Sequence, residues 1–76
     1  MKDFLEFVTR HLVDHPDRIR VELEERTDRL VLRLNVDQAD LGKVIGKQGR
    51  NAQALRTLVT AIAAREGHRV TLEIVQ

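Results

Sequence analysis

The residues of this sequence best suited to chemistry form one stretch, Gly46–Gly49, which reads Gly-Lys-Gln-Gly. Glycine permits positive φ angles and lets another backbone approach closely. A helical pattern follows this stretch at once, and a helix N-terminus presents unpaired N–H groups and a positive dipole end. Lys43, Lys47 and Arg50 surround the stretch with positive charge. Together these features predict a binding site for a phosphate group.

A glycine-rich phosphate-binding loop also occurs in nucleotide-hydrolysing enzymes, so the P-loop has to be considered. The stretch Gly42–Gln48 fails that pattern in three respects. Its glycine spacing is one residue short, Gln48 stands where a Ser or Thr would hold magnesium, and a predicted helix rather than a strand precedes it. No nucleophile paired with a general base is evident elsewhere. The sequence therefore predicts a binding protein with no catalytic residues, no metal and no cofactor, rather than an enzyme.

Composition and charge narrow the function further. The 76 residues predict one domain spanning residues 1–76, and a hydrophobic content of 42% indicates a globular chain. The absence of cysteine excludes a disulfide framework and a thiolate metal site, and the absence of a signal peptide or membrane span predicts a cytoplasmic protein. Residues 1–41 carry seven Lys/Arg and ten Asp/Glu, whereas residues 42–76 carry six and two. A polyanion would therefore be attracted to the half that begins at the glycine stretch.

Apolar periodicity predicts the elements that hold this stretch in place. Period 3.6 indicates helices and period 2 indicates half-buried strands. The expected order is helix, strand, strand, helix, helix, strand, over Asp3–Val13, Ile19–Glu24, Leu30–Val36, Gln38–Ile45, Arg50–Arg65 and Val70–Val75. Asp3 and Asp37 are expected to cap the first two helices. Since each strand buries one face only, the fold class is an α/β (α+β) two-layer sandwich with helices on one face of a three-stranded sheet.

The longest predicted helix carries two apolar rows. The row expected in the core consists of Ala52, Leu55, Val59, Ile62 and Ala63. A second row beside it consists of Ala54, Leu58 and Ala61. Small residues let another helix approach, so the second row is a candidate dimer surface, but it could equally widen the core row.

The end of the first helix offers one alternative site. His11, Asp14 and His15 have the i, i+3, i+4 spacing at which side chains can share a metal ion. Such pairs are common, and no fourth ligand is evident. Histidines at a solvated helix end that interact favourably with the helix dipole are the simpler interpretation.

The sequence Val44-Ile45-Gly46-Lys47-Gln48-Gly49 between two predicted helices, together with the order αββααβ, resembles the type II KH domain over essentially the whole chain. This resemblance implies that the loop clamps the sugar–phosphate backbone of single-stranded RNA. Gly46 and Gly49 would admit the phosphates, and Lys47 and Gln48 would contact their oxygens. Lys43 and Arg50 would add positive charge, and Val44 and Ile45 would line an apolar groove beside the bases.

The resemblance also implies partners. Bacterial single-KH proteins resemble RNA chaperones that act as homodimers or with a second, larger KH-containing protein, and they are associated with cell shape and cell-wall biogenesis. Two alternatives stay open. The chain could be a KH-fold protein–protein interaction module that does not bind RNA, since fold does not prove function. The glycines could also simply form a tight corner between two helices.

Overall fold

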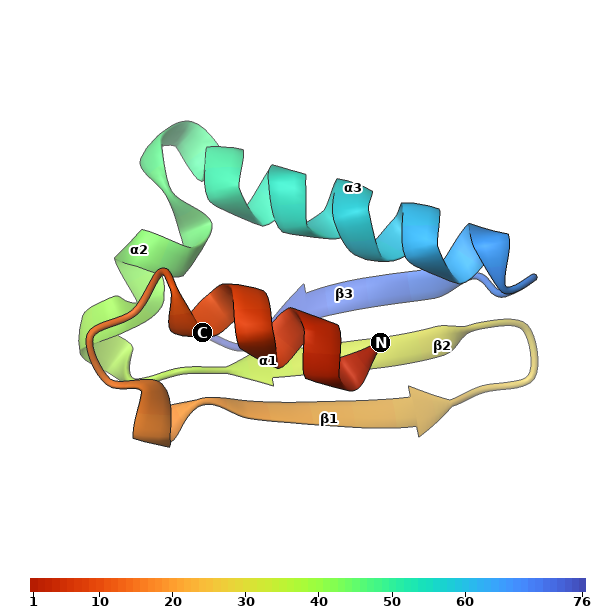
Figure 1. Ribbon diagram of the computed structural model, residues 1–76, viewed down its shortest axis with the longest axis horizontal. Coiled ribbons are helices and arrows are strands. Elements are labelled where there is room, and N and C mark those ends of the chain that lie inside the picture. The colour runs from red at the N-terminus through yellow and green to blue at the C-terminus, as the bar shows by residue number, and fades with distance from the viewer.

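The computed structural model describes all residues from 1 to 76. Three helices and three strands follow one another in the predicted order (Figure 1). Their bounds are α1 Lys2–Arg10, β1 Arg20–Glu25, β2 Leu30–Asn35, α2 Leu41–Ile45, α3 Arg50–Arg65 and β3 Val70–Ile74. Three short 3-10 turns lie between them, η1 Pro16–Arg18, η2 Gln38–Asp40 and η3 Lys47–Gly49. None of the helices combines the length and the apolar character that crossing a bilayer requires.

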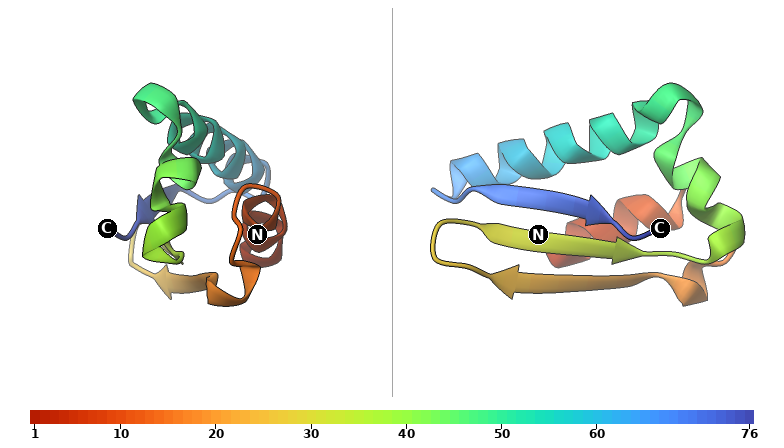
Figure 2. Two further views of the ribbon diagram at one scale, coloured as in Figure 1. Left: turned by 90° about the vertical axis from the view of Figure 1, so that its left-hand side faces the viewer. Right: turned by 180° about the vertical axis from the view of Figure 1, so that it is seen from behind.

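The three strands form one sheet in the order β1-β2-β3. The hairpin pairs β1 with β2 antiparallel, with Val21 opposite Leu34, which is the pairing that a short connection favours. The crossover through α2 and α3 returns the chain parallel to β2, with Leu32 opposite Leu72. Figures 1 and 2 show α1 and α3 on the same face of this sheet, which confirms the two-layer architecture and the fold class.

A single apolar core fills the space between the two layers. One residue of α1, one of α2 and two of α3 meet four from the sheet, which is the arrangement that the periodicity predicted. Its eight members are Leu5, Val21, Leu32, Leu34, Val44, Leu55, Val59 and Leu72. The core therefore ties α2 and α3, the two helices on either side of the glycine stretch, to the same sheet.

The other face of the sheet is covered by charged side chains. Arg33 on the central strand forms ion pairs with Glu24 of β1 at 2.8 Å and with Glu73 of β3 at 3.0 Å. These acidic residues are therefore the solvent face of the sheet, as alternation predicted, and each exposed pair adds little stability because water screens it.

Two details of the first helix differ from the sequence prediction. α1 ends at Arg10 rather than Val13, because the chain turns at His11 to reach η1. The prediction that Asp3 caps this helix is wrong. The N-cap is Met1, and no side chain caps it. Asp3 lies inside the first turn, where a carboxylate is still favourable to the helix dipole.

The predicted helix Gln38–Ile45 is in fact η2 followed by the short helix α2. Asp37 does cap it, because its Oδ1 accepts a hydrogen bond from the Ala39 backbone N–H at 2.9 Å. Within this segment the apolar Ala39 is exposed, whereas the charged Asp40 is fully buried. Leu23 alternates with the buried Val21 along β1 but is 45% exposed near the end of the strand.

Candidate nucleic-acid interface

The glycine stretch forms a compact loop whose backbone requires glycine at two positions. Gly46 has φ 78° and ψ 171°, and Gly49 has φ 75° and ψ 15°. Gln48 also has a positive φ, 57°, in the left-handed region that L residues seldom adopt. The loop is held at its base by a hydrogen bond from the Gly49 N–H to the Gly46 carbonyl oxygen at 3.1 Å.

Asn51 fixes the position of the loop between the two helices. Its Nδ2 donates to the Lys43 carbonyl oxygen at 2.7 Å, which joins α3 to α2. A Cβ placed on Gly46 would lie 2.7 Å from Asn51 Cγ and 2.8 Å from the Asn51 backbone nitrogen. Gly46 is therefore required by close approach as well as by its φ. Sequence reasoning missed Asn51, because nothing in the local sequence shows that its side chain reaches back eight residues.

The N-terminus of α3 is open to a ligand. Gly49 is its N-cap, no side chain accepts a bond from the first turn, and that turn carries no acidic residue. The first N–H groups of a helix lack carbonyl partners within the helix, and the dipole adds a partial positive charge there. An anion placed above this turn would be stabilised by both.

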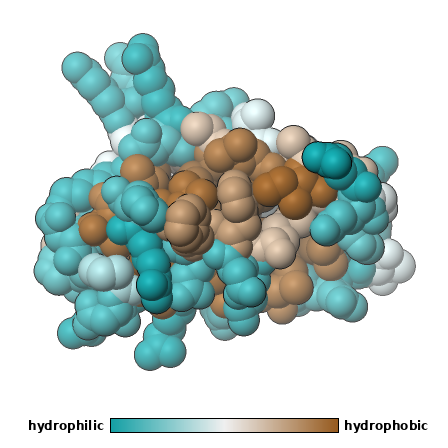
Figure 3. Space-filling model, in the orientation of Figure 1, coloured by the Kyte–Doolittle hydropathy of each residue, from teal (hydrophilic) through white to brown (hydrophobic).

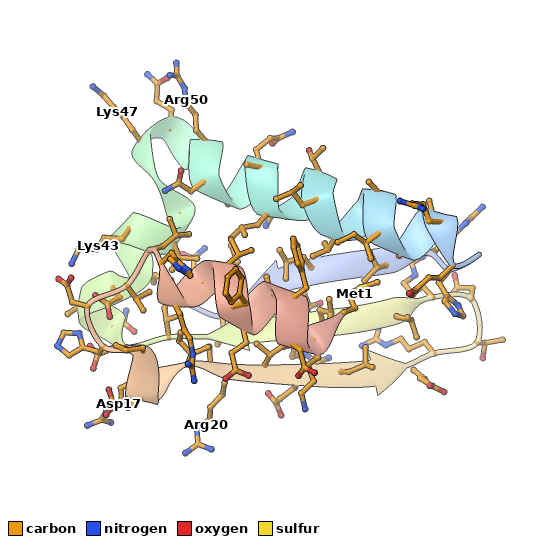
Figure 4. The ribbon with its side chains drawn as sticks, in the orientation of Figure 1. Met1, Asp17, Arg20, Lys43, Lys47 and Arg50 are labelled. Atoms are coloured by element: carbon orange, nitrogen blue, oxygen red, sulfur yellow. The ribbon has the colours of Figure 1, made fainter.

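Two cations extend from this loop into solvent. Lys47 and Arg50 are exposed, and neither forms an ion pair within the chain. Figure 4 shows both side chains pointing away from the body of the protein. Their charge is therefore available to a ligand at the N-terminus of α3.

Lys43 differs from these two cations. Its ammonium contacts Asp14 and also lies 3.4 Å from Asp40 Oδ1. The hydrogen bond to Asp14 raises the pKa of Lys43 above its usual value, and attraction to both carboxylates adds to this effect. The structure thus ties Lys43 to internal partners, and a direct phosphate contact by this residue would have to compete with them.

Asp40 anchors the chain between α1 and β1 to the helix before the loop. It is fully buried, and its carboxylate accepts hydrogen bonds from the backbone N–H groups of Asp14 at 3.2 Å and His15 at 2.9 Å. The His15 ring Nδ1 lies 3.0 Å from the same carboxylate. Burial alone would raise the pKa of Asp40, but these hydrogen bonds outweigh it and lower the pKa to about 2. Sequence reasoning assigned Asp40 no role.

His15 and His11 have separate partners. The hydrogen bond to Asp40 raises the pKa of His15 above its usual value of 6.5. His11 Nδ1 instead lies 2.9 Å from the Phe7 carbonyl oxygen on its own helix. The structure therefore does not bring these two rings and Asp14 together as one metal-ligand set.

Val44 and Ile45 were expected to line a groove beside the bases. Val44 is 0% exposed and belongs to the core, so this expectation is corrected: its side chain supports the loop from inside and does not reach a ligand. Ile45 is partly exposed at the end of α2, next to the loop. The structure thus brings Ile45, Lys47, Gln48 and Arg50 to the surface around the two glycines.

An αββααβ order, a three-stranded mixed sheet and a Gly-x-x-Gly loop between the last two helices define a KH domain of type II. The sequence profile "KhpA/KhpB, KH domain" matches residues 2–74. The chain belongs to this family of KH domains. Membership agrees with the prediction that the chain is not an enzyme.

The relatives match the chain over its whole length. The RNA-binding protein KhpA of Aquifex aeolicus (strain VF5) is 51% identical over 76 residues, which cover 100% of this chain and 96% of the relative. The RNA-binding protein KhpA of Bacillus subtilis (strain 168) is 47% identical over 74 residues, or 97% and 91% of the two chains. The RNA-binding protein KhpA of Clostridium acetobutylicum is 45% identical over 75 residues, which cover 99% of this chain and 100% of the relative.

Proposed function

We propose that this protein binds single-stranded RNA by capturing its phosphates at the Gly46–Gly49 loop. The relatives named RNA-binding protein KhpA support the ligand class. The geometry supports the mode of binding. A phosphate would accept hydrogen bonds from the first turn of α3, while Lys47 and Arg50 would neutralise its charge. Gln48 would add an amide donor at the tip of the loop.

The observation that carries this proposal is the charge distribution around an uncapped helix N-terminus. From Gly42 through Arg65 the chain has no acidic residue, so neither the loop nor α3 repels a polyanion. The contacts described are to phosphate and therefore carry little base preference. With two Phe and no Trp or Tyr, the chain has few aromatic rings on which bases could stack.

One such loop clamps about four nucleotides, so a single domain should bind weakly. We propose that useful affinity comes from pairing with a second KH domain, either another copy or that of a larger partner. The row Ala54, Leu58 and Ala61 is exposed on α3, and Leu58 is 43% exposed. Figure 3 shows apolar side chains gathered over α1 and α3 on the side of the molecule turned toward the viewer. Two linked loops would raise the effective concentration of RNA at each, and could hold two RNA segments together as a chaperone does.

Fluorescence anisotropy with a short unstructured RNA tests the proposal. Lys47→Asp with Gln48→Asp retains both glycines and should abolish salt-sensitive binding. The matched control, Arg18→Asp with Arg20→Gln, makes the same change in net charge. Figure 4 shows Arg20 on the opposite side of the protein from Lys47 and Arg50, so the control should bind almost as well as wild type. Equal loss in both variants would mean that net charge, and not the loop, is responsible. No binding by the wild type would favour the protein–protein interaction module.

A further inference from the structure

A second cluster of hydrogen-bond donors lies at the outer edge of β3, away from the glycine loop. A hollow of about 330 Å³ opens there between the C-terminal half of α3 and the start of β3. Seen from behind (Figure 2, right), the end of α3 meets the β1–β2 turn at one end of the molecule, and the glycine loop lies at the other. The polar side chains that line the hollow are Arg29, Thr60, His68, Arg69 and Thr71.

The chemistry of this lining suits an anion. Each of the five side chains can donate a hydrogen bond, and no carboxylate lines the hollow. Arg29 is held at the hollow by its Nη1, which donates to Thr71 Oγ1 at 3.4 Å. Its Nη2 pairs with Asp28 at 3.2 Å, so a phosphate at Arg29 would compete with this carboxylate, but both groups of the pair are well exposed and water screens their attraction. Arg69 has no ion-pair partner within the chain.

The backbone that carries these side chains is fixed. The Leu30 N–H donates to the Arg69 carbonyl oxygen at 2.8 Å, which joins the β1–β2 turn to the start of β3. The turn after α3 is closed by a hydrogen bond from the His68 N–H to the Ala63 carbonyl oxygen at 2.8 Å, with Gly67 at φ 79°. Arg29 and Arg69 are therefore held near each other although forty residues separate them in the sequence.

Basic residues near a helix C-terminus also stabilise the helix dipole, which offers a simpler reason for Arg69. That reason does not extend to Arg29, which comes from the β1–β2 hairpin, or to Thr60 and Thr71. It also predicts no dependence of RNA binding on these residues. Arg29 and Arg69 also line an adjoining hollow on the side of the β1–β2 turn, and there Glu25 and Asp28 lie beside them, so that side is less suited to an anion.

We infer that Arg29 and Arg69, with Thr60 and Thr71, bind a phosphate of the same RNA strand beyond the nucleotides held at the glycine loop. Thr60 lies ten residues after Arg50, which is about 15 Å along α3 at 1.5 Å per residue. An RNA that follows α3 meets no acidic side chain on this helix. The inference rests on the proposed function, because the loop supplies the first contact with the strand.

The test compares two RNAs by anisotropy over a range of salt concentrations. An RNA of about four nucleotides occupies the loop alone, and one of about ten nucleotides can extend to the second site. Each phosphate contact on a single strand contributes about 0.7 to the slope of log affinity against log salt. Wild type should therefore show a slope steeper by about 0.7 with the longer RNA, for the one phosphate bound at the second site. The double variant Arg29→Gln, Arg69→Gln should lose this increment and bind the short RNA unchanged.

Two further variants distinguish a specific site at the hollow from a general effect of net charge. Arg18→Gln with Arg20→Gln removes the same charge elsewhere and should keep the increment. Thr60→Glu places a carboxylate in the hollow from an exposed helical position and should lose it. A slope that does not depend on RNA length, or an equal loss in the control, would overturn the second site and leave the loop site intact. Failure of the short RNA to bind any of these proteins would instead overturn the proposed function.

Discussion

Replacing Gly46 or Gly49 with alanine should have unequal effects on the stability of the fold, although both glycines belong to the same motif. Both have positive φ, but their surroundings differ. A Cβ at Gly49 meets nothing within 4 Å, whereas a Cβ at Gly46 lies 2.8 Å from the backbone nitrogen of Asn51. That nitrogen belongs to the first turn of α3 and cannot move without shifting the helix.

The magnitudes follow from these two environments. Gly49 lies in the left-handed helical region, where an L residue costs about 1–2 kcal/mol. Alanine recovers about 0.4–1 kcal/mol of this by restricting the unfolded chain, so the net loss should be about 1 kcal/mol. Gly46, with ψ 171°, lies in a region occupied almost only by glycine, which costs about 1–3 kcal/mol. Overpacking against Asn51 adds about 1–3 kcal/mol. The Gly46→Ala protein should therefore lose about 3 kcal/mol or more, a large part of the total for a domain of this size.

Urea unfolding followed by circular dichroism at 222 nm measures these differences, provided the slope with denaturant is the same for both variants. Adding Asn51→Ala to the Gly46→Ala protein should recover only part of the loss, because the backbone nitrogen stays in place. Equal destabilisation by the two alanines, or full recovery in the double variant, would refute the close-approach argument.

Further predictions concern the residues around the loop. Asn51→Ala removes the hydrogen bond that Asn51 Nδ2 donates to the Lys43 carbonyl oxygen between α3 and α2, so it should cost about 1 kcal/mol in urea unfolding and weaken RNA binding; an unchanged RNA affinity would mean that Asn51 does not position the loop. The pKa of Asp40 is lowered from 3.8 to about 2, so its ionised form stabilises the fold above pH about 4, and this contribution is lost as pH falls through about 2. Asp40→Asn should therefore lower the urea midpoint at pH 7 and flatten its dependence on pH between 4 and 2; an unchanged pH profile would contradict this role. Because the pKa of His15 is raised above 6.5, its stabilising contribution is present below pH 6.5 and is lost as pH rises through the raised value, and His15→Gln should remove that decline. Leu58→Asp should shift a dimer to a monomer in light scattering without changing the affinity of the loop for a short RNA; an unchanged mass for an initially dimeric protein would remove the proposed pairing surface.

Periodicity in the sequence was sufficient to predict the architecture. Strands with one apolar face and helices with one apolar stripe have few ways to bury both, and the short β1–β2 connection determines the antiparallel pair. The prediction for α3 was confirmed at both ends, Arg50 and Arg65, because glycine-containing turns flank it. The bounds of α1 and α2 were less accurate. The end of α1 is not determined by local sequence, because the helix stops where the chain turns toward η1. Before α2 the charged Asp40 is buried while the apolar Ala39 is exposed, so apolar periodicity did not reveal that the segment is two short helices.

The geometry of the candidate site was predictable only where it depends on local sequence. The loop glycines, Lys47 and Arg50 follow from sequence spacing and lie together at the surface. The roles of Lys43 and Val44 depend on tertiary contacts. Lys43 is paired with Asp14 and Asp40, and Val44 is enclosed in the core. Arg29 and Arg69 lie forty residues apart, and only the parallel pairing of β2 with β3 brings them to one hollow.

The most direct test of phosphate capture at the loop is a titration of ¹⁵N-labelled protein with a four-nucleotide RNA, followed by amide chemical shifts. The backbone N–H groups of Gly46 through Asn51 should shift most, with smaller changes at Ile45. The sheet face around Arg33 should be unaffected. The Lys47→Asp, Gln48→Asp protein should show the same unbound spectrum away from the loop and no shifts with RNA. Shifts centred on the Leu58 face or on the open face of the sheet would contradict RNA capture at the loop.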